Sequence, residues 1–297
     1  MARYLGAHTS DSGGLHMTAR RAASAHMTAL QIFTAIPKFY GDKSNIRPER
    51  ADRFREALAD SEVRPEHVVV HAAYVLSVAT ADPAKWERAT AGLAKEMERS
   101  SELGVGQVCF HPGSASDGNP EAAAARVARA MVAALERVPD SPTRLLVENT
   151  AGAGKTLGRT AAEVGLILAH VPAALRSRVG YGLDTCHLHA SGYDIHTSPQ
   201  RLKDILDEFE DATGEAPSFF HLNDSAHEFA SNRDRHANIG EGTIGVDPFR
   251  WLFADPRSRD VPLILETPEA ETEPAPDDGA ADAWHVAMLE LLRAFDA

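Results

Sequence analysis

Nine His, Asp and Glu residues carry side chains of the kind that bind divalent metals, and six of them stand at the ends of short apolar segments. Imidazole and carboxylate ligands without thiolate suit Zn²⁺, with Mn²⁺ or Fe²⁺ also possible at one or more sites. Five imidazoles and four carboxylates are too many for one tetrahedral ion, and unpaired carboxylates gathered in one place would repel one another. The pattern predicts a centre of two or three metals, built from His71, His111, Glu148, Asp184, His187, His221, Asp234, His236 and Glu266.

The segments that precede these residues are β-branched and apolar, and longer segments with helical spacing separate them. The predicted strands are Tyr4–His8, Leu30–Phe33, Val68–Ala72, Gln107–His111, Leu145–Asn149, Val179–Asp184, Ser218–Leu222 and Leu263–Thr267. The predicted helices include Ala84–Glu102, Glu121–Val138, Ala161–His170 and Pro199–Thr213. Eight such units favour a closed α/β barrel of the (β/α)8 (TIM) type over an open doubly wound sheet. We expect residues 1–297 to form one such domain.

The candidate ligands lie where a barrel enzyme carries its active site, at the C-terminal ends of the strands. Predicted strands three to eight end at or beside His71, His111, Glu148, Asp184, His221 and Glu266. His187 follows the sixth strand, while Asp234 and His236 lie in the loop after the seventh. Any one of these histidines could be an ordinary loop residue, so the prediction depends on all nine residues meeting at one mouth.

Composition limits the possible partners and location of the chain. A formal net charge of −13 argues against a protein that coats nucleic acid with a general basic surface, so nucleic-acid contacts must be local. Two cysteines are too few for a disulfide framework and favour a reducing compartment. No stretch of 18 apolar residues occurs, so we expect a cytoplasmic protein without a membrane partner.

Several segments resemble the endonuclease IV family of apurinic/apyrimidinic (AP) site nucleases, and the resemblance extends over most of the chain. The matching segments are YLGAHTSDSGGL at the start, HPGS at 111–114, ENTAG at 148–152, GLDTCHLHASGYD at 182–194, HLNDS at 221–225, DRHANIGEG at 234–242 and ILET at 264–267. All nine candidate ligands carry the residue type of the family pattern.

The resemblance implies a trinuclear zinc site in which Glu148 bridges two ions. The implied ligand sets are His71, His111 and Glu148 for one ion, Glu148, Asp184, His221 and Glu266 for another, and His187, Asp234 and His236 for the third. The implied reaction cleaves double-stranded DNA 5′ to an abasic site, leaving a 3′-hydroxyl and a 5′-deoxyribose phosphate. It uses a hydroxide bridging two of the zinc ions, and Glu148 is the candidate catalytic residue. We expect the enzyme to be a monomer.

Departures from the family pattern concentrate at the positions where the family binds DNA. Lys38 stands where an Arg is common, and Tyr74 matches a residue that the family uses against DNA, so these two are the candidate DNA-binding residues. Val75 stands where a bulkier apolar residue occurs. A Lys, a Gly and an Arg of the pattern are replaced by Ala226, Ala230 and Asn232.

Two other functions fit part of the pattern. A sugar isomerase or epimerase on a similar barrel also binds divalent metals through carboxylates and histidines, but it needs fewer ligands. A barrel that binds DNA or a partner without catalysis would not need intact ligands. The discriminating feature is the third set, His187, Asp234 and His236, which an isomerase with one or two metals does not require.

Overall fold

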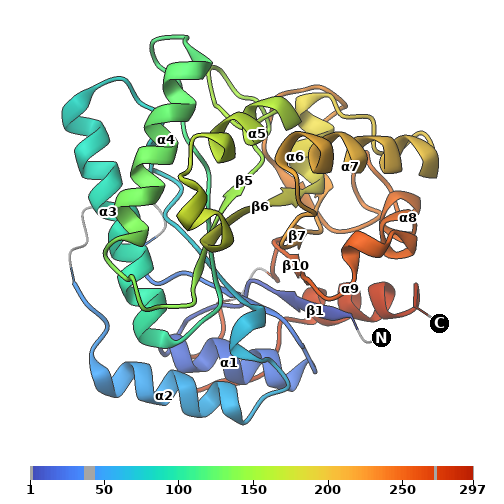
Figure 1. Ribbon diagram of the computed structural model, residues 1–297. Helices are drawn as coiled ribbons and strands as arrows, with labels where there is room; N and C mark the ends of the chain where they lie inside the picture. The colour runs from blue at the N-terminus through green and yellow to red at the C-terminus, as the bar shows by residue number, and fades with distance from the viewer. Residues whose placement is uncertain (1–2, 37–43, 271–272, 297) are drawn as a thin grey trace.

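Eight parallel strands form a nearly closed barrel in the computed structural model, which describes residues 3–36, 44–270 and 273–296 (Figure 1). The barrel strands are β1 (Tyr4–Ala7), β2 (Leu30–Ile32), β3 (Val68–His71), β4 (Gln107–Phe110), β5 (Arg144–Glu148), β6 (Val179–Asp184), β7 (Phe220–His221) and β10 (Pro262–Leu265). Their order is β1-β10-β7-β6-β5-β4-β3-β2, and a parallel bridge between His8 and Gln31 brings β1 and β2 together. The predicted (β/α)8 fold is confirmed.

Helices connect the strands and surround the barrel (Figure 1). They are α1 (Leu15–Ser24), α2 (Pro48–Ala59), α3 (Pro83–Leu103), α4 (Pro120–Leu135), α5 (Ala161–Ala169), α6 (Thr185–Ser191), α7 (Pro199–Thr213), α8 (Asp247–Ala254) and α9 (Ala283–Arg293), with 3-10 turns at Pro65–His67, Ala173–Arg178 and Pro256–Ser258. Helices α3, α4 and α7 begin with Pro after a capping side chain, supplied by Asp82, Asn119 and Ser198. These caps fix the helix starts close to their predicted positions.

One part of the predicted topology differs from the structure. The segment after β7 forms an antiparallel hairpin of β8 (Asp224–Ser225) and β9 (His236–Ala237), so His236 lies in a strand and not in a loop. Each of these strands has two residues, which is too short for an alternating apolar pattern to reveal it. The hairpin holds His236 beside the barrel strands.

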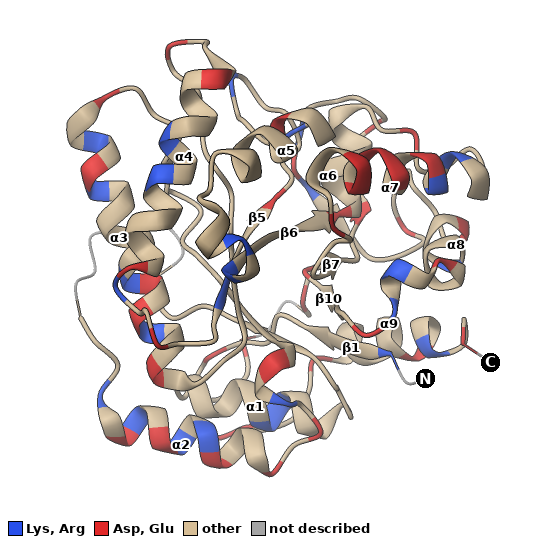
Figure 2. Ribbon diagram, viewed as in Figure 1, with Lys and Arg blue, Asp and Glu red and all other residues tan. Residues whose placement is uncertain are grey.

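Charged residues of both signs alternate along α2, and acidic residues are prominent on α7 (Figure 2). The buried faces of the helices pack with the strands in the apolar core. Among the described residues we find no helix that combines the length and the apolar character needed to cross a membrane.

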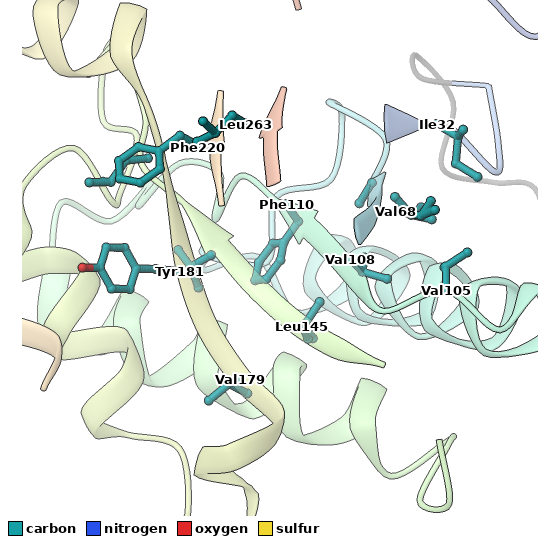
Figure 3. Packing of buried hydrophobic residues seen from close by; sticks show 14 of the residues in the cluster. Ile32, Val68, Val105, Val108, Phe110, Leu145, Val179, Tyr181, Phe220 and Leu263 are labelled. Atoms are coloured by element: carbon teal, nitrogen blue, oxygen red, sulfur yellow. The ribbon is translucent and has the colours of Figure 1, made fainter. Parts of the chain in front are cut away.

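The apolar core has two layers because successive strand residues point to opposite faces of the sheet. The larger layer lies between strands and helices, and Phe110, Leu145 and Tyr181 belong to it (Figure 3). A smaller cluster is formed by alternate residues, which face the barrel interior: Ala29, Val69, Cys109, Leu146, Phe219 and Ile264. The interior layer forms the floor beneath the mouth of the barrel.

Candidate metal centre

The strand alternation that builds the interior layer also places the candidate ligands. Two residues after an interior side chain, the next side chain points into the barrel again. The pairs are Val69 and His71, Cys109 and His111, Leu146 and Glu148, Phe219 and His221, and Ile264 and Glu266. On β6 the interior position before Asp184 is Gly182, where a β-carbon would come within 2.1 Å of the Phe219 ring. A glycine there lets β6 carry Asp184 past this bulky side chain.

Glu148 lies at the centre of the group and is fully buried. Its Oε2 atom is 3.1 Å from His71 Nε2 and 3.2 Å from His111 Nε2. Its Oε1 atom is 2.9 Å from His221 Nδ1 and 3.4 Å from His187 Nδ1. The two oxygens therefore face different imidazoles, which is the arrangement that a bridging carboxylate requires.

The remaining candidate ligands form two further groups whose ligand atoms lie within 4.8 Å of one another. One group is Glu148, Asp184, His221 and Glu266, and the other is His187, Asp234 and His236. In the second, the Asp234 carboxylate is 3.2 Å from His187 Nε2 and 3.1 Å from His236 Nε2. The structure thus brings together all nine side chains named from the sequence.

Hydrogen bonds to the backbone orient three of the imidazoles. The Nδ1 atoms of His71, His187 and His236 lie 2.7, 2.9 and 3.0 Å from backbone carbonyl oxygens. A carbonyl oxygen only accepts, so Nδ1 must carry a proton and donate it. Each of these rings then presents Nε2 to the centre, as metal-binding histidines commonly do when their other nitrogen is hydrogen-bonded.

Two buried asparagines hold Asp184. The Asn223 Nδ2 group donates to Asp184 Oδ2 at 2.6 Å, and the Asp184 backbone N–H donates to Asn149 Oδ1 at 2.6 Å. Asn223 Oδ1 also accepts from the Glu266 backbone N–H at 2.9 Å. Asp184 further caps α6 by accepting from the His187 backbone N–H at 2.8 Å, so one carboxylate links two of the groups.

Asp224 shapes the hairpin that carries His236, a role the sequence analysis missed. Its buried carboxylate accepts from five backbone N–H groups, those of Ser225, Gly240, Gly242, Ile244 and Gly245. A β-carbon at Gly242 would lie 2.4 Å from Asp224 Oδ1, so glycine is required there. The clue in the sequence was an acidic residue in HLNDS followed by the glycine-rich GEGTIG segment.

The charges of the group are balanced by protons on the imidazoles. Burial lowers the pKa of His71, but its hydrogen bond to Glu148 and the nearby carboxylates outweigh burial and raise the pKa to about 9. The pKa of His236 is likewise raised to about 9, because neighbouring carboxylates outweigh burial. Burial raises the pKa of Glu266, but the charge of His221 outweighs it and the pKa falls to about 2. A metal binding here must displace imidazole protons.

The donor set fits divalent metal ions. The Nε2 atoms of His111, His187 and His236 are buried, and among the described residues their contacts of 3.1–3.2 Å with carboxylate oxygens lack the geometry of a hydrogen bond. Buried polar atoms seldom lack a partner, and each that does calls for an explanation. Imidazole nitrogens directed at carboxylates match the ligand preferences of zinc.

Comparison with known proteins gives a consistent result along the whole chain. A family model described as a xylose isomerase-like TIM barrel matches residues 19–293. A probable endonuclease 4 of Trichlorobacter lovleyi is 37% identical over 293 residues, covering 98% of this chain and 100% of its own. The chain belongs to the endonuclease IV family. A probable endonuclease 4 of Chloroflexus aurantiacus is 36% identical over 288 residues, covering 97% of both chains.

Solved structures agree with this assignment. Endonuclease IV from Thermus thermophilus has a TM-score of 0.80 and 32% identity, covering 99% of this chain and 98% of its own. A D-tagatose 3-epimerase-like protein has a TM-score of 0.71 but only 16% identity over 98% of this chain and 96% of its own, so it shows a shared fold alone. The resemblance to the endonuclease IV family is confirmed.

Of the two residues predicted to bind DNA, the structure describes Tyr74, which is exposed beside the candidate ligand His71. Tyr74 is 49% exposed, and its ring stands edge-on to the rings of Phe33 and His71, at 5.2 and 5.0 Å between centroids. Val75 beside it is 40% exposed. Lys38 lies outside the described residues. Tyr74 therefore contacts a candidate ligand while keeping half of its surface free.

The substituted loop between β8 and β9 keeps a backbone that favours glycine. Ala230 and Asn232 have φ values of +58° and +55°. Asn tolerates the left-handed region better than Ala does. Ala230 therefore holds a strained conformation at the position where the family pattern has glycine.

Gln31 is a buried contact of the group that the sequence analysis missed. Its amide lies between Glu266 and His221. The alternation that places the ligands also predicts its direction, because Ala29 belongs to the interior layer and Gln31 follows it by two residues. An uncharged amide is not a typical zinc ligand, so the search for ligands passed over it.

Proposed function

We propose that this protein is a metal-dependent DNA-repair endonuclease that cleaves double-stranded DNA 5′ to abasic sites. The products are a 3′-hydroxyl and a 5′-deoxyribose phosphate. The observation that carries the proposal is the convergence of nine His, Asp and Glu side chains around Glu148. The similarity to endonuclease 4 relatives extends over almost their full length, and this similarity supports DNA as the substrate.

Three zinc ions fit the three groups of ligands, with Glu148 shared between two of them. Zinc at such a site acidifies water and offsets the negative charge of a phosphodiester undergoing hydrolysis. Manganese or iron would fit one or more positions, because the donors are imidazoles and carboxylates.

Glu148 would orient the attacking water. Burial raises the pKa of its carboxyl group, but the charges of His221 and His111 outweigh burial and hold the pKa well below its usual range. The carboxylate is therefore ionised at neutral pH and accepts hydrogen bonds. Its burial at the base of the mouth excludes bulk water from the reacting phosphate.

The acidic chain would hold DNA through local cations on the loops around the mouth. Exposed basic residues lie on the loop after β5 and beside Asp234: Lys155, Arg159, Arg233 and Arg235. The two loops touch, since a β-carbon at Gly152 would lie 2.6 Å from Asn232 Oδ1. Phosphate contacts from these cations would position the duplex. An abasic nucleotide lacks base pairing and stacking, so it enters a deep site at less cost than an intact one.

The proposal includes residues 1–297 acting as one domain and one monomer. A sedimentation mass near 32.0 kDa for the active species supports the monomer. A mass twice that value would contradict it.

The test is cleavage of an end-labelled duplex with a single tetrahydrofuran abasic analogue, with and without chelator. We expect one cut 5′ to the analogue, loss of cutting after chelation and recovery with zinc. Extension of the product by a DNA polymerase would demonstrate the 3′-hydroxyl. Equal cutting of an undamaged duplex, or no chelator-sensitive cut, would overturn the proposal. Turnover of a keto-sugar instead would favour the epimerase alternative.

A further inference from the structure

Gln31 connects two of the nine side chains, although β2 supplies none of them. The Gln31 side chain is completely buried. Its Nε2 atom is 2.5 Å from Glu266 Oε1, and its Oε1 atom is 2.6 Å from His221 Nε2. Both contacts cross the barrel interior, from β2 to β7 and to the end of β10.

The orientation of the Gln31 amide is fixed by its partner. The Glu266 Oε1 atom lies 2.5 Å from the Gln31 amide, and the carboxylate form that binds a metal ion only accepts hydrogen bonds. The Gln31 NH2 group must therefore face Glu266, which leaves the Gln31 oxygen facing His221. A flipped amide would place two acceptors against each other at 2.5 Å.

This orientation decides which nitrogen of His221 faces the centre. An amide oxygen only accepts, so His221 Nε2 must carry a proton and donate it to Gln31. The other ring nitrogen, Nδ1, lies 2.9 Å from Glu148 Oε1 and 3.1 Å from Glu266 Oε2. His221 therefore presents Nδ1, whereas His71, His187 and His236 present Nε2.

The group that accepts the hydrogen bond of the ring also differs between His221 and the other three histidines. The other three rings donate to backbone carbonyls, which any residue supplies. His221 depends on a side chain, and a single substitution removes it. The backbone at Gln31 is held by its bridge to His8 and by its pairing with Val69 on β3.

We propose that Gln31 is a positioning residue that selects the Nδ1-binding form of His221 and holds Glu266 in place for one metal ion. That ion is the one shared by Glu148, Asp184, His221 and Glu266. The inference rests on the proposed metal centre. It assigns Gln31 to this one of the three ions, because within the described residues the hydrogen bonds of its amide go to Glu266 and His221, which both belong to this set.

The experiment measures metal binding by the full chain before any assay of activity. Gln31→Met keeps the approximate volume of the side chain and removes both hydrogen bonds. Gln31→Asn keeps the amide but is one methylene too short to reach both partners. The matched control is Gln107→Met on β4, because the Gln107 amide donates to the Glu66 carbonyl and contacts none of the nine side chains.

We expect both Gln31 variants to bind one of three zinc ions about 10- to 100-fold more weakly in chelator competition, with the other two unchanged. The visible absorption of the cobalt-substituted protein should also change in both Gln31 variants, because the environment of one ion changes. Gln107→Met should match the wild type in both measurements. Circular dichroism identifies a variant that fails to fold. If Gln31→Met does not fold, the zinc affinities of Gln31→Asn test the inference, since this variant keeps a polar group at the position.

Three zinc affinities in Gln31→Met equal to those of the wild type would overturn the inference and leave the proposed function intact. An equal loss of all three ions in the folded variants would also overturn it, because the effect would not be local to one site. Failure of the wild type to bind metal would instead contradict the proposed function, so the two failures are distinguishable.

Discussion

The inner wall of the barrel and its outer rim are built in different ways. On the inner wall, Glu148, Asp184 and His221 are fully buried at the ends of strands. On the rim, Tyr74 and Phe229 keep 49% and 42% of their surfaces exposed on loops. The inner groups contact one another through buried hydrogen bonds, whereas the rim residues have few partners.

The inner wall is the part of the molecule that determines the geometry of the candidate metal centre. Strand alternation determines the direction of each inner side chain, so a change there disturbs the whole group. On the rim, Ala230 adopts a left-handed backbone conformation in the loop between β8 and β9. Reaction chemistry on rigid strands with recognition on variable loops is typical of barrel enzymes. We expect inner substitutions to affect metal binding and turnover, and rim substitutions to affect DNA affinity.

The largest effect should come from Glu148→Gln. The neutral amide cannot bridge two cations or accept from imidazoles at both ends, so turnover of abasic duplex should fall by about 10⁴-fold or more. Zinc content, measured by mass spectrometry on the folded variant, should fall with it. Full turnover with normal zinc content would contradict the role of Glu148 and weaken the distinction between wall and rim.

Metal removal should change how stability depends on pH. The folded pKa of His71 is about 9, above its usual 6.5, so its pairing stabilises fully below pH 6.5 and is lost as pH rises through 9. The folded pKa of Glu266 is about 2, below its usual 4.5, so its contribution is present above pH 4.5 and is lost as pH falls through 2. The metal-free protein should be most stable between pH 4.5 and 6.5.

Zinc-loaded protein should not share the alkaline loss, because its ligand imidazoles are already neutral. The difference in melting temperature between zinc-loaded and chelated protein should therefore widen from pH 6.5 to pH 9. Thermal melts at fixed free zinc would check this. Parallel melting curves across that range would show that the imidazole protons do not compete with metal.

The sequence predicted the inner wall much better than the rim. His71, His111, Glu148, His221 and Glu266 follow interior residues by two positions, and this regularity can be read from eight short apolar segments. The hairpin with His236 has strands of two residues and no periodic signal. Its shape depends on Asp224 accepting five backbone N–H groups, which only the folded chain brings together. Gln31 was passed over because its role depends on partners over 180 residues away.

On the rim, Tyr74→Ala should weaken binding of abasic duplex about tenfold or more, since stacking on a base contributes about 1–3 kcal/mol. Tyr74→Phe is the matched control and should bind as the wild type does. Because the ring of Tyr74 also contacts His71, zinc content must be measured in parallel. Loss of zinc from Tyr74→Ala would show that Tyr74 supports the metal centre, which would contradict the proposed division between inner wall and rim.

The smallest effect should come from Ala230→Gly. Glycine adopts the φ of +58° without the steric cost of a β-carbon, so the free energy of unfolding should rise by up to about 1 kcal/mol. Ala226→Gly in the same loop is the control. Ala226 is not among the positive-φ residues, so this change should lower stability by about 0.4–1 kcal/mol. Equal effects of the two substitutions would show that strain at Ala230 is negligible.

The nine side chains around Glu148 should form one centre of three metal ions. Anomalous diffraction at the zinc edge, on crystals grown with zinc, tests it directly. We expect three peaks inside the barrel mouth, with Glu148 contacting two of them and His221 contacting one through Nδ1. Crystals without a peak at this position, in which the imidazoles and carboxylates remain paired with one another as in the metal-free arrangement, would contradict it.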